Sequence, residues 1–346
     1  MDAPTPPAPR RPALTDVATL AGVSHMTVSR VINDTGPVKP ETRARVLAAI
    51  QELDYRPNSA ARTLATGRSQ TLGVVTLDST LFGPASTLYG IENAARQSGY
   101  AINISSLRTP DRTSIGDAVE SLRSQAVEGI IVIAPHDAAV RALAYVPRHV
   151  PMVAVGVGSG AVPRVSVDQV DGARRATEHL LSLGHETVWH VGGPPEWLEA
   201  RAREESWRET LERHGIAPPA PLLRGDWSPR SGYEQGRLLV QQRHLTAVFV
   251  ANDQMALGVL RALGEAGVRV PQDVNIVGFD DVPEAAYFNP PLTTVRQDFI
   301  EVGRRTFDLL LEQIWGEQTD GKPAPGSSTV PAELIIRDST SPRSGS

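Results

Sequence analysis

A short run of polar and large side chains near the N-terminus has the chemistry needed to read DNA. Thr27 and Ser29 carry hydroxyl groups that suit hydrogen bonds to phosphates or base edges. The Arg30 guanidinium can donate two hydrogen bonds to O6 and N7 of guanine. His25 and Met26 are large and stand near the start of the same predicted helix, where they point outward. If this helix enters a major groove, these side chains contact the bases.

Two other interpretations of the same residues stay open. Met26 could belong to a hydrophobic core, which would leave His25 merely exposed. Arg30 could pair with Asp34 one turn later on the helix. Residue types alone do not separate these alternatives.

Two predicted helices with a tight turn between them would position this run. Thr15 can cap a first helix, with Asp16 in its first turn at the positive end of the helix dipole. Gly22 ends that helix, because a residue with positive φ is needed there. Ser24 then caps a second helix, and a third follows Pro40. This order of short helices predicts a helix-turn-helix.

The apolar residues of these helices have the spacing of a three-helix core. Two helices that cross steeply need a small residue at the crossing, a glycine in the turn and a branched apolar residue behind it. Ala18, Gly22 and Val28 stand in that order. The other predicted inner positions are Val31, Ile32, Val46, Ile50 and Leu53.

A further short segment follows Pro57, which blocks continuation of the third helix. Asn58 is a good N-cap and Gly67 ends the segment, so residues 59–65 would make about two turns. A helix this short is not stable alone in water and needs a surface on which to fold. Leu64 is unexpectedly apolar for a linker, which suggests a wedge between base pairs in a minor groove. A plain linker helix is the alternative.

Residues 14–67 resemble the DNA-binding head of the lactose-repressor (LacI/GalR) family of bacterial transcription regulators. The matching motifs are Asp16-Val-Ala, Ala21-Gly-Val-Ser, Thr27-Val-Ser-Arg-Val-Ile-Asn, Thr42-Arg, Leu53-Asp-Tyr-Arg-Pro-Asn, and Ala61 with Leu64. The resemblance implies that the segment after Pro57 is a hinge helix that orders on operator DNA. It also implies that Leu64 levers open the central base step and that Tyr55 and Asn58 contact the DNA backbone nearby. The candidate DNA-binding residues are Leu14, Thr15, Ser24, His25, Met26, Thr27, Ser29, Arg30, Asn33, Thr42, Tyr55, Asn58, Ala61 and Leu64.

The distribution of charge agrees with a head that meets a polyanion. Between Arg10 and Gln70 the net charge is +4, which leaves −9 for the rest of a chain whose total is −5. A basic end on an acidic body is expected where one end binds nucleic acid. An ordinary solvated surface is the alternative, and charge alone does not decide between them.

After Gly67, short apolar runs alternate with helical segments, a pattern typical of parallel α/β sheets. The predicted strands are 72–77, 101–105, 129–133, 152–155, 187–191, 247–250 and 275–278. The predicted helices include 87–98, 170–183, 199–214, 229–241 and 254–266. This length exceeds what one sheet needs, so we expect two lobes. A ligand would bind between them at the carboxyl ends of the strands.

This body resembles the effector-binding core of the same family, whose fold is similar to that of periplasmic sugar-binding proteins. The matching motifs are Val167-Asp168, His179-Leu180, Gly184-His185, Asn252-Asp253-Gln-Met-Ala-Leu-Gly258, Val277-Gly-Phe-Asp-Asp281 and Pro290-Pro-Leu-Thr-Thr-Val295. The residues that match the family's ligand contacts are Arg203, Trp227, Asn252, Asp280, Gln297 and Phe299. The chemistry agrees, because sugar hydroxyl groups suit carboxylate, guanidinium and amide partners, and the apolar face of a sugar ring suits stacking on an aromatic side chain.

Some of these residues also have a structural interpretation. Arg203 could form a surface ion pair with Glu199 or Glu204, and Trp227 could be mere core. Both alternatives stay open at this point.

The chain departs from galactoside-binding relatives in its first lobe. Where those relatives use polar side chains, this chain has Leu77, Ile133 and Gly156, which make an unusually apolar face. A different sugar, a glycoside or a non-sugar ligand therefore stays open.

Several classes of protein are disfavoured. The chain has no cysteine, which excludes disulfides and thiolate sites. It carries no P-loop, no Gly-x-Ser-x-Gly elbow and no His-Glu-x-x-His motif, so we expect neither an enzyme nor a cofactor or metal site. The Pro-rich start lacks an apolar signal region, and no apolar run has the length of a membrane span. We expect a cytoplasmic, nucleoid-associated protein.

The sequence thus predicts an α/β protein with an N-terminal all-α helix-turn-helix head and hinge helix, followed by a two-lobed periplasmic-binding-protein-like domain of parallel sheets. The predicted parts are a disordered tail (1–12), the head (13–57), the hinge (58–70), the two-lobed domain (71–338) and a disordered tail (339–346). The expected function is a homodimeric repressor of carbohydrate-use genes that binds a pseudo-palindromic operator in double-stranded DNA. Its small effector would be a sugar. The alternative is a corepressor-dependent regulator or activator that responds to a non-sugar metabolite.

Overall fold

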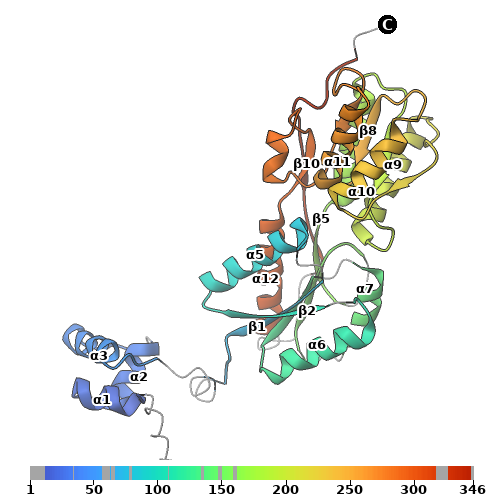
Figure 1. Ribbon diagram of the computed structural model, residues 1–346. Coiled ribbons are helices and arrows are strands. Elements are labelled where there is room, and N and C mark those ends of the chain that lie inside the picture. Colours follow the sequence, from blue (N-terminus) through green and yellow to red (C-terminus); the bar gives the residue numbers. More distant parts are fainter. Residues whose placement is uncertain are drawn as a thin grey trace, which may run out of the picture. The chain divides into compact units, whose positions relative to one another are not determined.

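The chain forms two compact units, Met1–Ser69 and Gln70–Ser346 (Figure 1). The computed structural model describes residues 12–33, 35–56, 63, 67–77, 80–107, 109–133, 136–146, 150–158, 162–316 and 326–343, apart from the side chain of Asn33. Each unit is described by itself below.

The first unit is a three-helix head, as predicted. Its helices are α1 (Leu14–Ala21), α2 (His25–Asn33) and α3 (Pro40–Glu52). Val17, Val28 and Val46 are fully buried between them, and Ala18 lies in the same core where α1 meets its neighbours. The apolar spacing in the sequence therefore forms the core that it predicts.

The turn between α1 and α2 also follows the local sequence. Gly22 has φ 63°, and its N–H caps the end of α1, while the Ser24 hydroxyl oxygen accepts a bond from the Thr27 N–H at 3.2 Å. The prediction that Thr15 caps α1 is wrong. The N-cap is Ala13, two residues earlier, and the Asp16 carboxylate accepts a bond from the Ala13 N–H at 2.7 Å at that end of the helix.

The first lobe of the second unit is a parallel six-stranded sheet with two helices on each face (Figure 1). Its strand order is β11-β5-β4-β3-β1-β2. The strands are β1 (Thr71–Leu77), β2 (Ala101–Leu107), β3 (Gly129–Ile133), β4 (Met152–Val155), β5 (Arg164–Val167) and β11 (Ser328–Val330). The helices α5 (Phe82–Gln97) and α12 (Phe299–Gly316) lie side by side on one face, and α6 (Arg112–Ser124) and α7 (Asp137–Leu143) cover the other.

The second lobe is built around a parallel four-stranded sheet of order β7-β6-β8-β9. These strands are β6 (Trp189–Gly192), β7 (Leu223–Arg224), β8 (Ala247–Val250) and β9 (Asn275–Val277). The helices are α8 (Gln169–Ser182), α9 (Leu198–Arg213), α10 (Pro229–Leu239), α11 (Asp253–Glu265) and the short η1 (Pro283–Tyr287). Strand β10 (Thr294–Gln297) pairs antiparallel with β12 (Ala332–Ile335) beside this sheet.

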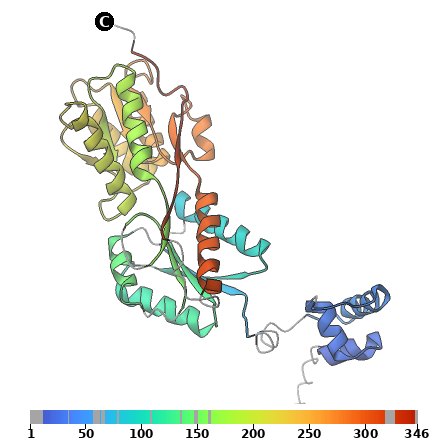
Figure 2. The same cartoon turned by 180° about the vertical axis from the view of Figure 1, so that it is seen from behind.

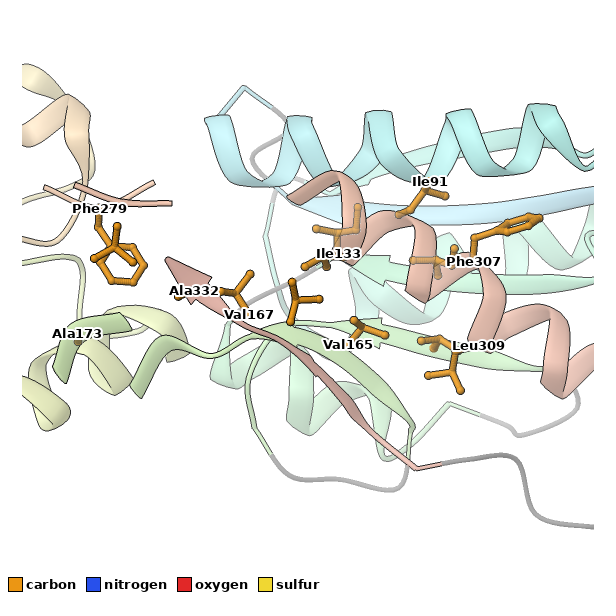
Figure 3. Close-up of a cluster of buried hydrophobic side chains, with 14 of the residues drawn as sticks. Ile91, Ile133, Val165, Val167, Ala173, Phe279, Phe307, Leu309 and Ala332 are labelled. Atoms are coloured by element: carbon orange, nitrogen blue, oxygen red, sulfur yellow. The ribbon is translucent and has the colours of Figure 1, made fainter. Parts of the chain in front are cut away.

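The chain passes between the two lobes three times (Figure 2). The crossovers run from β5 to α8, from β10 to α12, and from β11 to β12. One hydrophobic cluster continues through them, from Phe279 in the second lobe past Val167 and Ala332 to Ile133 in the first (Figure 3). The lobes therefore share one core at the crossovers, which limits how they can move against each other.

The predicted α/β pattern is confirmed, and each predicted strand overlaps an observed one. Helix α5 begins at Phe82, five residues before its predicted start, because the Gly83-Pro84 pair fits within its first turn. The helices α6, α7 and α12 and the short strands β5, β7, β10, β11 and β12 were not among the predicted elements.

The prediction of a disordered tail over 339–346 is wrong for residues 339–343, which pack on the second lobe. The Ser339 side chain is fully buried, donates to the Ile276 carbonyl at 2.6 Å and accepts from the Thr293 N–H at 2.8 Å. Thr340 bonds to the Thr293 hydroxyl, and the Ser341 carbonyl accepts from Asn275. The polar composition that suggested disorder instead serves these buried bonds.

We expect Ser339→Ala to lower the free energy of unfolding by about 1–3 kcal/mol, because it leaves the buried Thr293 N–H without an acceptor. Denaturant unfolding of the full chain measures this loss. Ser341→Ala is the matched control, because its described bond uses only the main-chain carbonyl. Equal stability of the two variants would contradict the anchoring role.

Candidate functional site

The outward face of α2 carries the predicted DNA-reading side chains. His25 and Arg30 are exposed, and Met26 is 54% exposed, whereas Val28 on the opposite face is fully buried. This arrangement excludes the alternative in which Met26 belongs to the core. The exposed face of a second helix in such a head is the one that can enter a major groove.

The other predicted DNA contacts of the head divide into three groups. Ser24 and Thr15 are exposed, and Leu14, Thr27, Ser29 and Thr42 are half-buried. The Tyr55 side chain is mostly buried in the three-helix core, where burial raises the pKa of its hydroxyl. Asn58, Ala61, Leu64 and the Asn33 side chain lie outside the described residues, as does the Asp34 partner proposed for Arg30.

A pocket of about 330 Å³ lies between the two lobes of the second unit. All six predicted effector contacts line it, namely Arg203, Trp227, Asn252, Asp280, Gln297 and Phe299. They come from α9, from strand ends and from the crossover that joins β10 to α12. Residues nearly a hundred positions apart in sequence are thus brought to one cavity by the folding of the sheets.

Four of the lining side chains form a buried hydrogen-bonded network at the crossovers, called here the crossover network. The Arg203 Nε donates to Gln169 Oε1 at 2.8 Å, and Gln169 Nε2 donates to Gln297 Oε1 at 2.7 Å. Gln297 Nε2 donates in turn to Asp280 Oδ1 at 2.5 Å. Asp280 Oδ1 lies 3.9 Å from Arg203 NH1, which closes the circuit.

Burial controls the charges in this network. Burial raises the pKa of Asp280 to about 6, against the opposing effects of Arg203 and of the bond from Gln297. The Arg203 side chain is only 5% exposed, and its guanidinium carbon lies 4.0 Å from the Phe279 ring centroid and 5.6 Å from that of Trp227. Arg203 is therefore no surface ion pair, and Glu204 pairs instead with Arg208 and Arg224.

Two lining residues have backbone conformations that are unusual for side-chain-bearing residues. Asp280 has φ 117° and Trp227 has φ 75°. The Asn252 amide donates to the Trp227 carbonyl at 3.2 Å, and its Oδ1 caps α11 by accepting from the Met255 N–H. Trp227 is also part of the second lobe's hydrophobic cluster, so it serves both core and pocket. Residues held in such conformations cluster at functional sites.

The first-lobe side of the pocket is largely apolar, as predicted, but the hydroxyl-bearing Thr80, Thr87 and Ser166 also line it. Ile133 and Gly156 line it, together with Phe82, Pro84 and Val155. Leu77 is buried and is not among the lining residues.

Most of the lining residues were not among the predicted ligand contacts. Three of these take part in the crossover network or in contacts between the lobes: Gln169, Trp197 and Glu199. Gln169 follows Asp168 directly at the end of β5, which was a usable signal, because ligands bind at the carboxyl ends of parallel strands. Glu199 lies four residues before Arg203 and so on the same face of α9. Trp197 contacts Trp227 edge to face, with ring centroids 5.5 Å apart, and nothing in its sequence neighbourhood pointed to the pocket.

The lobes also touch outside the crossovers, through contacts called here the interlobe clasp. Arg201 on α9 makes two hydrogen bonds to the Asp137 carboxylate on α7, one of them at 2.8 Å. These bonds lower the pKa of Asp137. The Trp197 ring packs on His136 with centroids 4.9 Å apart, and the Val157 N–H donates to Glu199 Oε1 at 3.2 Å. The clasp contacts exist only in lobe arrangements that keep the start of α9 close to α7 and to the segment after β4.

Among the described residues, no group of three or more histidine, aspartate and glutamate side chains has a metal-binding arrangement. Within the same part of the chain, no helix is both long and apolar enough to cross a membrane.

An exposed recognition helix, joined in one chain to a two-lobed unit with a polar pocket at its crossovers, defines a ligand-responsive transcription regulator. Comparison with known proteins agrees. Residues 13–58 match the family model "Bacterial regulatory proteins, lacI family", and residues 177–340 match "Periplasmic binding protein-like domain". The chain belongs to the lacI family of bacterial regulatory proteins.

Individual relatives span nearly the whole chain. The lactose operon repressor of Escherichia coli (strain K12) is 36% identical over 94% of this chain and 90% of its own length. The transcriptional regulator CelR of Thermobifida fusca is 35% identical over 95% of this chain and 98% of its own length. A crystal structure of the lac repressor dimer bound to operator and the anti-inducer ONPF superposes with a TM-score of 0.84 at 36% identity, covering 96% of this chain and 99% of that one.

The buried Glu199 carboxylate should make stability depend on pH. Burial raises its pKa to about 7, although its own backbone N–H, Arg203, the Val157 N–H and Arg164 favour the ionised form. Because the folded pKa exceeds the unfolded one, the folded state binds more protons, and stability falls as pH rises from about 4.5 to 7. We expect wild type to lose about 2–3 kcal/mol relative to Glu199→Gln between pH 5 and pH 8.

Denaturant unfolding at both pH values measures this difference. The exposed Glu205 on the same helix provides the control, and Glu205→Gln should keep the wild-type pH dependence. Parallel pH profiles for wild type and Glu199→Gln would show that the Glu199 pKa is not raised in the folded protein.

Proposed function

We propose that this chain is a dimeric repressor of carbohydrate-use genes, whose affinity for a pseudo-palindromic DNA operator is controlled by a small sugar-like ligand in the interlobe pocket. The crossover network is the observation that carries this proposal. It joins Arg203 and Asp280 of the second lobe to Gln169 and Gln297, which lie on two of the segments that connect the lobes. A ligand that binds there acts directly on the lobe arrangement.

The proposed mechanism is a shift between two lobe arrangements. A ligand that contacts Arg203 and Asp280 more favourably in one arrangement stabilises that arrangement, by an amount equal to its difference in affinity. The proposed hinge, residues 58–70, transmits the change to the heads, and a coupling free energy of ~1–3 kcal/mol is typical. In this proposal residues 13–57 read the DNA, and residues 71–343 bind the ligand and form the dimer.

Relatives support the parts of this proposal. One solved structure is a lac repressor dimer on operator DNA, and another is a complex of the regulator CelR with cellobiose, with a TM-score of 0.68 and 32% identity. We extend these properties to this chain. We propose also that it has no catalytic activity and that it acts on DNA in the cytoplasm. The apolar first-lobe wall favours a second candidate, a corepressor-dependent regulator or activator that responds to a non-sugar metabolite.

Selection of random duplex DNA by the purified full chain at physiological salt tests the proposal. We expect enrichment of a pseudo-palindrome with a flexible central step, because two recognition helices read two half-sites and the hinge helices open the centre. Enrichment only with added sugars would identify a corepressor. No enrichment with or without sugars would refute sequence-specific regulation.

Asp280→Asn should weaken sugar binding by about ten- to a hundredfold, because it removes a charge-assisted acceptor from the pocket. Operator affinity, measured on the selected DNA, should change by less than about threefold. Asp117→Asn, at an exposed position of α6, is the control for both measurements. A parallel loss of operator affinity in Asp280→Asn would assign Asp280 a structural role.

A further inference from the structure

The Glu199 carboxylate is the acceptor in the pocket that lacks a full set of donors. Its Oε1 accepts a hydrogen bond from the Val157 N–H at 3.2 Å, and its own backbone N–H also stabilises the ionised carboxylate. Its Oε2 is buried and has no hydrogen-bond partner among the described residues. A buried carboxylate oxygen without a donor costs free energy that a suitable partner would recover.

The other charges of the pocket do not supply that partner. Among the described lining residues the charged side chains are Glu199, Arg203 and Asp280, so the ionised set has a net negative charge. Arg203 donates to Gln169 and the Ala251 carbonyl and lies beside Asp280. Its guanidinium is therefore committed to the crossover network, and no described cation forms an ion pair with Glu199.

Glu199 also stands at a distinctive place in the cavity. It lies one turn before Arg203 on the same face of α9, so it continues the polar wall of the second lobe beyond the crossover network. Its bond to Val157 places its carboxylate against the first lobe, whose lining there includes the apolar Ile133 and Val155. It thus brings a carboxylate to a wall whose polar lining side chains, among the described residues, are the hydroxyls of Thr80, Thr87 and Ser166.

We propose that Glu199 is a specificity-determining residue of the pocket, whose Oε2 accepts a hydrogen bond from a hydroxyl or amino group of the ligand. The pocket then selects ligands that carry a donor at this position in addition to the polar groups that meet the crossover network. This inference rests on the proposed function, because it concerns the same ligand site.

The geometry also connects this contact to the lobe arrangement. A ligand donor favours the ionised form of Glu199, and an ionised carboxylate accepts the Val157 N–H more strongly than a neutral one. Because Val157 belongs to the first lobe and Glu199 to the second, the same ligand contact strengthens a bond of the interlobe clasp. The Glu199 carboxylate would therefore bind the ligand through Oε2 and strengthen a contact between the lobes through Oε1.

The experiment uses the full chain and a defined panel of glucose, galactose, cellobiose, lactose and the 2-amino-2-deoxy forms of the two monosaccharides. Calorimetry gives the affinity of each sugar, and the tightest binder is then compared with its singly deoxygenated analogues. For wild type we expect one analogue to bind about tenfold more weakly, as befits loss of a hydrogen bond to a charged group. Glu199→Gln should bind that analogue and the parent sugar with nearly equal affinity.

An amino donor and a hydroxyl donor on the sugar predict different binding preferences. If the donor is an amino group, the amino sugar binds wild type more tightly than its parent sugar, and Glu199→Gln abolishes this preference. If it is a hydroxyl group, the parent sugar is preferred. Glu205→Gln, on the exposed face of α9, should keep the wild-type pattern.

Denaturant unfolding of Glu199→Gln checks that the variant is folded, and a general folding defect would weaken binding of the parent sugar and its analogues alike rather than remove the discrimination between them. The inference is overturned if Glu199→Gln retains the wild-type discrimination against every analogue, or if no panel member binds wild type. Either outcome leaves the selection of operator DNA intact, whereas failure of that selection would instead overturn the proposed function.

Discussion

The second unit depends above all on the burial of one positive charge, that of Arg203. A guanidinium with 5% exposure is stable only if its donors are satisfied and a negative charge lies near it. Gln169, the Ala251 carbonyl and Asp280 meet this requirement, and the Phe279 ring covers one face. Ala251, Phe279 and Asp280 follow the adjacent strands β8 and β9, and Gln169 lies on the crossover from β5 to α8. The need to satisfy the buried Arg203 guanidinium thus helps to fix where the lobes connect and where the pocket lies.

The same arrangement explains why the pocket combines rigidity with a capacity to respond. The crossovers are enclosed by a hydrophobic cluster that runs through both lobes, so the strands there cannot separate without exposing apolar surface. The contacts of the interlobe clasp are different, because they consist of a few polar bonds and one ring contact. The lobes are therefore held firmly where the chain crosses and weakly where it does not, which is the mechanical basis of a hinge.

Much of this organisation could be predicted from the sequence, and the remainder depends on tertiary contacts. The head follows from local rules, since Gly22 in the turn and Val28 behind it suffice to place α2. The alternation of strands and helices predicts two lobes. The roles of Gln169 and Glu199 are not local, because each depends on a residue far away in the chain, Gln297 in one case and Val157 in the other. The tail near Ser339 looks disordered by composition, yet its hydroxyl group completes buried bonds of the second lobe.

The three crossovers also determine when each part can form during synthesis. The head needs only its three helices, the last of which ends at Glu52, so it can fold as soon as it leaves the ribosome. The first lobe has only α5 on one face until α12 has been made, and it lacks an edge strand until β11 has been made. The second lobe is incomplete until β12 and the segment around Ser339 have been synthesised. A DNA-binding head is therefore complete long before the domain that controls it, and polypeptides released early would carry an unregulated head.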